Sequence, residues 1–350
     1  MADMPPLVLG QLGLGYWGPN LLRNFTAVDG CRVKWVADPD PGRQAYARRM
    51  FPATAPVADW QTVVHDPEVE AVVVVTPAAG HFELARAALA AGKHVMVEKP
   101  LAMCRRDAQS LCALASAKNR VLMVGHTFLY NAAVRRAKQY IEDGELGQIY
   151  YILSERLNLG RVRQDVNVMW NLAPHDIAII LYWLGEAPSQ VAARGLTFLQ
   201  DGIPDVAFMD LDFPSGRAAH IHVSWLDPHK TRRMTVVGSK KMLVYDDVSA
   251  EAKITLYDRG IDKRNILRDL PDIESFGQFQ LMRRSGDVYI PKIDFEEPLR
   301  VECRHFVECV RLGRAPLADG QNGVAVVAVL EAAQRSLGNG CGPMPLGTLP

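Results

Sequence analysis

A glycine-rich segment near the start of the chain has the spacing of a dinucleotide-binding loop. Gly13, Gly15 and Gly18 match the pattern G-x-G-x-x-G, and Tyr16 and Trp17 stand between the last two glycines. The first glycine would permit a tight turn, the second would let backbone N–H groups approach a pyrophosphate, and the third would allow a helix to pack closely on a strand. Because a β-rich run precedes the motif and a helical pattern follows it, we expect these five residues to contact a dinucleotide.

Asp38 stands where an acidic residue would select the cofactor. It ends the second β-rich run, 20 residues after Gly18. Its carboxylate would accept hydrogen bonds from ribose hydroxyls and repel a 2′-phosphate, which favours NAD. Arg43, five residues later, could stack on adenine or accommodate a phosphate, so the sequence leaves NADP open. A solvated helix residue explains Arg43 equally well.

Two turns that follow apolar runs carry a second set of polar residues. Thr76 and Pro77 follow one run, and Glu98 and Lys99 follow the next. Ligands of open α/β sheets bind beyond the carboxyl ends of strands, so we expect both turns beside the cofactor. Desolvation there would favour a neutral Lys99 amine prepared for proton transfer, although a structural ion pair with Glu98 is an equal alternative. His81 is expected either to line the same crevice or to cap a helix.

A histidine in the second half of the chain is a further catalytic candidate. Pro174 predicts the start of an apolar helix, which would place His175 and Asp176 in its first turn. The positive end of that helix would bias His175 toward the neutral form that accepts a proton. Asn171, one turn earlier, could hydrogen-bond to a substrate hydroxyl. A lone histidine at a helix start is commonly structural, but these neighbours favour a functional role.

The elements that must position these residues change in character along the chain. Up to residue 125, short β-rich runs alternate with helical patterns, which predicts an α/β fold with a doubly wound parallel sheet of the Rossmann type. From about residue 148, turn-linked strands and one apolar helix predict an α+β domain with a mainly antiparallel open sheet. We expect a dinucleotide-binding domain over 1–125, a substrate-binding and oligomerisation domain over 126–337, and an extended tail over 338–350.

The predicted strands and helices follow from these patterns. Strands are expected over 7–12, 32–37, 71–75, 94–97, 121–124, 149–155, 191–197, 206–213, 218–224, 234–237 and 241–245. Helices are expected over 19–27, 43–50, 82–91, 107–118, 176–184, 299–312 and 323–337.

The composition argues against several classes of function. Lys+Arg and Asp+Glu both number 39, so no excess of positive charge favours nucleic acid or anionic lipid. The N-terminus lacks the pattern of a secretory signal, and no apolar run approaches the ~20 residues of a membrane span. Six cysteines without a Cys-x-x-Cys pair predict neither a disulfide framework nor a metal site. We expect a cytoplasmic protein whose partner is a small molecule.

Taken together, these residues resemble the glucose–fructose oxidoreductase, inositol dehydrogenase and rhizopine-catabolism (Gfo/Idh/MocA) family. The similarity runs from Gly13 to the end of the His175 helix, and more loosely through the sheet that follows. The resemblance implies a Rossmann domain and a C-terminal sheet that binds substrate and forms a homo-oligomer, a dimer or tetramer. It also implies redox chemistry, dependent on a pyridine nucleotide, at a carbinol of a sugar, inositol or sugar nucleotide.

The resemblance further implies roles for individual residues. Lys99 and His175 would be the acid/base and positioning pair, and Thr76, His81 and Glu98 would lie by the nicotinamide half of the cofactor.

The sequence departs from the family pattern at two positions. The family commonly has Asp four residues before the histidine, where this chain has Asn171, and many members have Asp three residues after it, where this chain has Ala178. Asp176 is the available substitute as an orienting carboxylate. The division of labour between Lys99 and His175 therefore stays open.

Two segments resemble family members found with sugar-nucleotide biosynthesis. These are the residues 15–20 and the run from Arg156 to Arg163. The nearest analogy is to dehydrogenases acting at C3 of UDP-N-acetyl-hexosamines or their uronic acids. Arg156, Arg161 and Arg163 are expected in one loop, where guanidinium groups suit phosphate or carboxylate. A solvated basic loop or a subunit contact is an equal alternative.

Two other functions fit the same residues. One is a dehydrogenase of free sugars, inositols or aminocyclitols, and the other is a non-catalytic NAD-binding sensor. The presence of both Lys99 and His175 argues against the sensor, which needs no proton-transfer pair.

Overall fold

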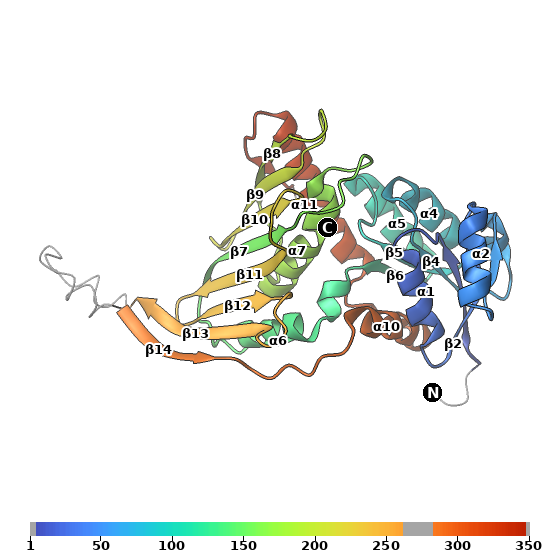
Figure 1. Cartoon of the computed structure of the whole chain (residues 1–350), viewed down its shortest axis with the longest axis horizontal. Coiled ribbons are helices and arrows are strands. Elements are labelled where there is room, and N and C mark those ends of the chain that lie inside the picture. Colours follow the sequence, from blue (N-terminus) through green and yellow to red (C-terminus); the bar gives the residue numbers. More distant parts are fainter. Residues whose placement is uncertain (1–4, 262–282, 348–350) are drawn as a thin grey trace, which may run out of the picture. The chain divides into compact units, whose positions relative to one another are not determined.

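The computed structural model describes residues 5–261 and 283–347, and it divides into two compact units. The first comprises the described part of Met1–Asn131 together with Glu296–Glu331. The second comprises the described parts of Ala132–Phe295 and Ala332–Pro350. Each unit is built around one sheet (Figure 1).

The sheet of the first unit has six parallel strands in the order β3-β2-β1-β4-β5-β6. The strands are β1 (Leu7–Leu12), β2 (Cys31–Ala37), β3 (Ala55–Val57), β4 (Ala71–Val74), β5 (His94–Glu98) and β6 (Leu122–Gly125). All four residues of β4 are buried, as expected for a strand covered on both faces. This strand order is that of the Rossmann fold, so the predicted doubly wound sheet is confirmed.

Helices follow the strands of this sheet. They are α1 (Gly18–Thr26), α2 (Pro41–Met50), α3 (Trp60–His65), η1 (Ala78–Gly80), α4 (His81–Ala90), α5 (Arg105–Ala117) and η2 (Thr127–Tyr130). The predicted elements lie within two residues of these bounds. The sequence patterns missed β3 and α3 because both are short and β3 contains a proline, which removes the usual strand signal.

Helix α10 (Pro298–Leu312) belongs to the first unit, which differs from the predicted boundary at 126–337. Its apolar face packs on α1 (Figure 1). The rings of Phe25 and Phe306 meet there edge to face, with their centroids 6.1 Å apart. The backbone of Met123 in β6 also forms an isolated bridge to Asp319. Contacts between residues far apart in the sequence thus make residues 296–331 part of the first unit.

The second unit contains a nine-stranded sheet in the order β14-β13-β12-β11-β7-β10-β9-β8-β15. Its strands are β7 (Ile149–Leu157), β8 (Gln190–Leu196), β9 (Val206–Asp212), β10 (Ala218–Ser224), β11 (Thr231–Gly238), β12 (Met242–Asp246), β13 (Ile254–Ile261), β14 (Arg283–Tyr289) and β15 (Met344–Pro345). The β7–β10 pair is parallel and the other pairs are antiparallel. The predicted mainly antiparallel sheet is confirmed.

Helix α7 (Val168–Leu184) packs against β7, β9 and β10 of this sheet (Figure 1). Helix α6 (Ala132–Glu142) contacts α7, and α11 (Gly320–Gly338) ends in this unit. The sequence patterns did not predict α6, β13 or β14. Within the tail predicted to be extended, β15 pairs with β8, so that part of the tail completes the edge of the sheet.

Candidate functional site

The glycine loop joins β1 to α1 and has the conformation that only glycine allows. Gly13 has a φ of +99°, and a Cβ there would lie 2.6 Å from the carbonyl oxygen of Val75. A Cβ at Gly18 would lie 2.8 Å from the carbonyl oxygen of Gly13. The first and third glycines are therefore required by the close approach of backbone to backbone.

A buried glutamine, which the sequence patterns did not single out, fixes the same loop. The Gln11 side-chain amide donates hydrogen bonds to the carbonyl oxygens of Gly13 at 2.9 Å and Gly18 at 3.0 Å. Gln11 lies inside β1 between apolar neighbours. A polar residue in an otherwise apolar strand, two positions before the first glycine, was the available signal.

Asp38 lies against the glycine loop. Its Oδ2 accepts a hydrogen bond from the backbone N–H of Leu14 at 2.8 Å and an ion pair from Arg43 Nη1 at 3.2 Å. Arg43 Nη1 is also the one described atom within 4 Å of the position that a Cβ of Gly15 would take. Gly15, Asp38 and Arg43 thus lie close together, and their contact with a cofactor stays a prediction.

These features fit a dinucleotide. A Cβ at Gly15 would still lie 3.9 Å from Arg43 Nη1, so the backbone there is open to a phosphate, and α1 presents its N-terminus at the end of the same loop. A carboxylate has about four lone-pair sites, so Asp38 keeps the capacity to accept a hydroxyl donor beside its contacts with Leu14, Arg43 and the backbone N–H of Asp40. Tyr16 and Trp17, between the glycines, are exposed.

His81 joins the two turns that were expected beside the cofactor. Its Nδ1 lies 2.7 Å from the carbonyl oxygen of Pro100, and its Nε2 lies 2.9 Å from that of Thr76. Burial lowers the pKa of His81, the two carbonyls oppose this shift, and Lys99 adds to it. A neutral imidazole has one N–H, so it donates to one carbonyl at a time. Because the ring is buried against these carbonyls, His81 fits a positioning role better than the predicted cofactor contact.

Lys99 follows β5, and its peptide bond to Pro100 is cis. Its backbone N–H donates to Glu98 Oε2 at 3.2 Å. Glu98 itself is buried, and burial raises its pKa to about 7. The charge of Lys99, the backbone N–H of Lys99 and the Trp17 side chain each act to lower that pKa. A carboxyl group therefore lies beneath the turn that carries the candidate amine.

The carboxyl ends of four neighbouring strands collect the candidates of the first unit. In the order β2-β1-β4-β5, these ends carry Asp38, the loop that starts at Gly13, Thr76 with Pro77, and Lys99. The strand order explains why residues scattered over almost ninety positions meet at one edge of the sheet.

Helix α7 begins earlier than the sequence predicted. Asn167 is its N-cap, and the side chain of that residue accepts a hydrogen bond from the backbone N–H of Trp170 at 3.0 Å. Pro174 lies inside the helix, and His175 is in its second turn. The predicted first-turn position of His175 is therefore wrong, and so is the argument from the helix end, whose field is confined to the first turn.

Arg156 and Asp176 form a buried ion pair. Arg156 Nε lies 2.7 Å from Asp176 Oδ2, Nη2 lies 3.0 Å from Oδ1, and the two side chains are 5% and 2% exposed. Burial acts to lower the pKa of Arg156, but the Asp176 carboxylate outweighs it and the pKa is raised. Arg156 lies on β7, so its predicted place in a phosphate-binding loop is wrong. Asp176 is engaged by this arginine, so the predicted role of orienting His175 is not supported.

The other two arginines lie in the loop after β7 as predicted. Arg163 forms a two-point ion pair with Asp165, through Nε to Oδ1 at 2.8 Å and Nη2 to Oδ2 at 2.5 Å. Arg161 is exposed. On α7, Asn171 Oδ1 accepts a hydrogen bond from the indole N–H of Trp225 at 3.2 Å.

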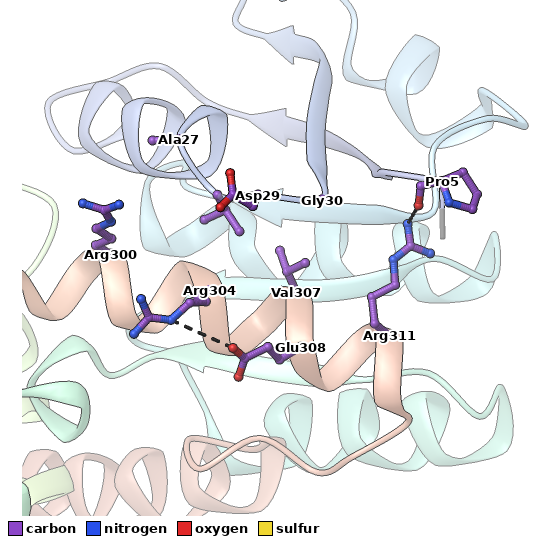
Figure 2. Close-up of a pocket in the computed structure, with 10 residues that line it drawn as sticks. Pro5, Ala27, Asp29, Gly30, Arg300, Arg304, Val307, Glu308 and Arg311 are labelled. Atoms are coloured by element: carbon purple, nitrogen blue, oxygen red, sulfur yellow. Dashed lines mark hydrogen bonds and ion pairs between the residues drawn. The ribbon is translucent and has the colours of Figure 1, made fainter. Parts of the chain in front are cut away.

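A groove of about 500 Å³ lies elsewhere in the first unit, between α10 and the turn after α1 (Figure 2). Its arginines are engaged, since Arg304 lies 3.9 Å from Glu308 and Arg311 donates to the carbonyl oxygen of Pro5 at 2.6 Å. The ten residues that line it include none of the predicted site residues. This groove is therefore separate from the glycine loop.

Among the helices of residues 5–261 and 283–347, none is both long and apolar enough to cross a membrane. The same residues contain no group of three His, Cys, Asp or Glu side chains that could hold a metal ion.

Two family models match the chain. The model described as "Oxidoreductase family, NAD-binding Rossmann fold" matches residues 9–126. The model described as "GFO/IDH/MocA C-terminal domain" matches residues 134–244.

Curated relatives match over almost the whole chain. A scyllo-inositol 2-dehydrogenase (NAD(+)) of Bacillus subtilis is 26% identical over 345 residues, which cover 95% of this chain and 93% of the relative. A UDP-N-acetylglucosamine 3-dehydrogenase of Acidithiobacillus ferrooxidans is also 26% identical, over 325 residues that cover 91% and 93%. Among solved structures, a putative oxidoreductase from Magnetospirillum magnetotacticum is 31% identical with a TM-score of 0.78, covering 94% of this chain and 99% of that one.

Proposed function

The chain belongs to the Gfo/Idh/MocA oxidoreductase family, and from this premise we propose that it oxidises or reduces a ring carbinol of a sugar with NAD. The leading substrate class is a UDP-linked N-acetyl-hexosamine or its uronic acid, acted on at C3. The observation that carries the reaction type is the convergence of the glycine loop, Asp38 and Lys99 at the ends of neighbouring strands.

The glycine loop and Asp38 would hold the cofactor. The backbone of Gly13, Gly15 and Gly18 would face the pyrophosphate, and Asp38 would accept ribose hydroxyls. NAD would supply the acceptor or donor of the hydride at the sugar carbon. Arg43, beside Gly15 and Asp38, would cover the adenine half.

Lys99 is the residue to which we assign proton transfer. When a carbinol becomes a ketone, its C–H bond yields a hydride and its O–H bond yields a proton, and that proton needs a base. A neutral Lys99 amine would accept it, and the ammonium would return it in the reverse direction. Thr76, Pro77 and His81 would hold the neighbouring turn, since His81 contacts the carbonyl oxygens of both Thr76 and Pro100.

Two residues of α7 are the candidates in the second unit. His175 is the alternative base, and Asn171 would orient the reacting hydroxyl through its side-chain amide. Because His175 lies in the second turn of α7, its protonation state has to come from its surroundings rather than from the helix end.

The choice of substrate class draws on two kinds of support. Arg161 and Arg163 lie in the loop after β7, where they would bind a diphosphate, and a relative named UDP-N-acetylglucosamine 3-dehydrogenase spans 91% of this chain. A relative named scyllo-inositol 2-dehydrogenase, with the same identity, favours a free polyol as the second candidate.

A direct assay separates these candidates. The purified protein is mixed with NAD or NADP and with UDP-N-acetylglucosamine, its uronic acid, scyllo-inositol or myo-inositol, and the absorbance of the reduced nicotinamide is followed. We expect turnover with NAD and a UDP-sugar. Turnover with inositols alone would replace the proposed substrate class by the second candidate. Binding of NAD without turnover of any compound in either direction would favour the sensor.

We also propose that the nine-stranded sheet mediates a homo-oligomer, either a dimer or a tetramer. Tyr151 is 47% exposed on β7, a central strand of that sheet, so an apolar ring is available for such a contact. Light scattering coupled to size exclusion tests this, and the mass of a single chain would contradict it.

A further inference from the structure

A cluster of polar side chains is buried in the first unit at the carboxyl ends of β5 and β6. Glu98 ends β5 and stands opposite Gly125 of β6 in the parallel pair, and His126 and Thr127 follow Gly125. Glu302 joins them from α10, where its Oε2 accepts a hydrogen bond from the Thr127 hydroxyl at 2.7 Å. Two carboxyl groups thus come together from a strand and a helix far apart in the sequence, and His126 lies between Gly125 and Thr127 in the chain.

Gly125 makes room for one of these carboxyl groups. A Cβ at Gly125 would lie 3.0 Å from the Cδ, Oε1 and Oε2 atoms of Glu98. The carboxyl group of Glu98 therefore lies directly against the Gly125 backbone, and a larger residue there would displace it.

The members of the cluster are removed from water and incompletely paired. Glu302 is 0%, His126 1% and Glu98 8% exposed. Within the part of the chain that the structure describes, neither ring nitrogen of His126 has a hydrogen-bond partner, and neither does Oε1 of Glu98 or of Glu302. Buried polar atoms without partners are costly, so their concentration at one place calls for a functional reason.

Burial and mutual repulsion decide the charge of each group. Burial raises the pKa of Glu302 well above its usual range, and the neighbouring Glu98 raises it further against the hydrogen bond from Thr127. Burial lowers the pKa of His126 to about 3, and Lys99 adds to this effect. At neutral pH, His126 is therefore an uncharged imidazole, and burial favours the uncharged acid form of Glu302.

Glu98 differs because positive and donor groups face it. Its Oε2 accepts the backbone N–H of Lys99, and the Lys99 charge and the Trp17 side chain both favour its ionised form. On α10, the neighbour of Glu302 is Cys303, a buried thiol whose pKa is raised well above its usual range by burial and by these carboxyl groups. The cluster therefore contains one group, Glu98, that can carry a negative charge at neutral pH.

We propose that Glu302 is a positioning residue for Lys99, because as an uncharged acid it holds the Thr127 turn and leaves Glu98 as the single carboxylate behind the Lys99 turn. Two ionised carboxylates in one dry site would repel each other, and Glu98 would then take up a proton. Lys99 would lose its balancing charge, and its turn would lose a charged hydrogen-bond acceptor. The inference rests on the proposed role of Lys99 in proton transfer.

The first test is the thermal unfolding of the protein without added ligand, between pH 5 and pH 9. Glu302→Gln keeps the size and polarity of the uncharged acid, and Glu308→Gln, a half-exposed carboxylate on the same helix, is the matched control. The wild type holds a proton that the unfolded chain releases above about pH 4.3, so its stability falls as pH rises, and Glu302→Gln removes that contribution. We expect the thermal unfolding midpoint of Glu302→Gln minus that of the wild type to increase steadily with pH. The same difference for Glu308→Gln should stay constant. A level difference for Glu302→Gln would overturn the proposal.

The second test is the pH dependence of kcat and KM. We expect Glu302→Gln to keep kcat at pH 7 within about threefold of the wild type, because a neutral isostere preserves the hydrogen bond to Thr127. Glu98→Gln, which removes the charge itself, should lower kcat more than it raises KM and should change the pH profile. A folded Glu302→Gln protein that has lost its turnover at pH 7 would contradict an uncharged Glu302.

The two proposals fail in different ways. Full turnover in Lys99→Ala would remove the catalytic assignment, yet the pH dependence of unfolding in Glu302→Gln would be unchanged. If Lys99→Ala loses turnover as expected but the midpoint difference between Glu302→Gln and the wild type does not change with pH, only the inference about Glu302 is contradicted.

Discussion

The Asp38 carboxylate accepts a hydrogen bond from the backbone N–H of Leu14 at 2.8 Å, across 24 residues of sequence. The acidic residue that ends β2 thus holds the glycine loop that follows β1. Under the proposed function, the side chain that holds the loop would also select the cofactor. This link makes Asp38 the sharpest single test of the cofactor site.

Asp38→Asn should weaken NAD binding by about ten- to a hundredfold, the range expected when charged hydrogen bonds become neutral ones. The amide oxygen can still accept from Leu14, so the loop should keep its shape. NADP should lose less affinity than NAD, because repulsion of a 2′-phosphate disappears. Titration of NAD and NADP by protein fluorescence checks this, with the exposed Asp29→Asn as control. Equal affinities of the variant and wild type for NAD would place Asp38 outside the cofactor site.

Lys99→Ala should reduce turnover at least ~10²-fold while NAD affinity changes little, because a positioned proton-transfer group contributes on that scale. Lys118→Ala, an exposed lysine at the end of α5, is the control and should be neutral. Single-turnover measurements of reduced nicotinamide would separate the chemical step from binding. If His175→Ala loses turnover and Lys99→Ala does not, the proton-transfer role belongs to His175.

The Rossmann half could be predicted from sequence because its signals are local. The six residues of β1 were predicted as 7–12 because an apolar run ends at a glycine motif. Strand order then brought Thr76 and Lys99 to one edge without further information. A pattern that repeats along the chain is sufficient for elements of this kind.

The place of Arg156 and the start of α7 could not be predicted, because they depend on interactions that the local sequence pattern does not show. Arg156 looked like a loop arginine beside Arg161 and Arg163, but its partner Asp176 lies 20 residues away and holds it inside the second unit. Asn167, rather than Pro174, begins α7, because a side-chain cap outweighs a proline that the helix tolerates in its interior.

Glu302 gave a weak signal of its own. It lies among Leu299, Cys303 and Phe306 on the apolar face of α10, where an acidic residue is out of place. His126, directly after a buried strand, satisfied the same strand-end rule that identified Lys99. Both could have been noted from the sequence, but their common location required the packing of α10 on the first sheet.

Removing one partner of the Arg156–Asp176 pair should be costly. Arg156→Met leaves a buried carboxylate without its cation, and about 3–5 kcal/mol of the free energy of unfolding should be lost. A double variant, Arg156→Met with Asp176→Leu, should recover most of that loss, because both charges are then removed together. Urea unfolding monitored by tryptophan fluorescence checks both. If Arg156→Met is stable and raises only the KM for a UDP-sugar, the arginine binds substrate phosphate after all.

Arg161→Ala combined with Arg163→Ala should raise the KM for a nucleotide sugar by about tenfold or more and leave kcat nearly unchanged, because charged hydrogen bonds to phosphate contribute on this scale. A neutral polyol should show no change in KM. The control is Asp165→Asn, which removes the ion pair of Arg163 and leaves both arginines in place. A uniform loss of turnover with every substrate would instead indicate that the loop after β7 has a structural role.

The raised pKa of Glu98, about 7, predicts how stability changes with pH. Between about pH 4.3, where an unfolded glutamate titrates, and pH 7, the folded protein holds a proton that the unfolded chain has released. The contribution of Glu98 to the free energy of unfolding should therefore fall as pH rises, by at most about 1.4 kcal/mol per pH unit, and level off above pH 7. His94 and His126 act oppositely, because burial lowers their pKa values to about 4 and about 3, so their contribution to stability grows as pH rises toward 6.5.

The measurement is the free energy of unfolding in urea of the wild type minus that of Glu98→Gln. The histidine contributions cancel in this difference, which should decline from pH 5 to pH 7. A difference that stays constant over this interval would mean that Glu98 is ionised in the folded protein throughout.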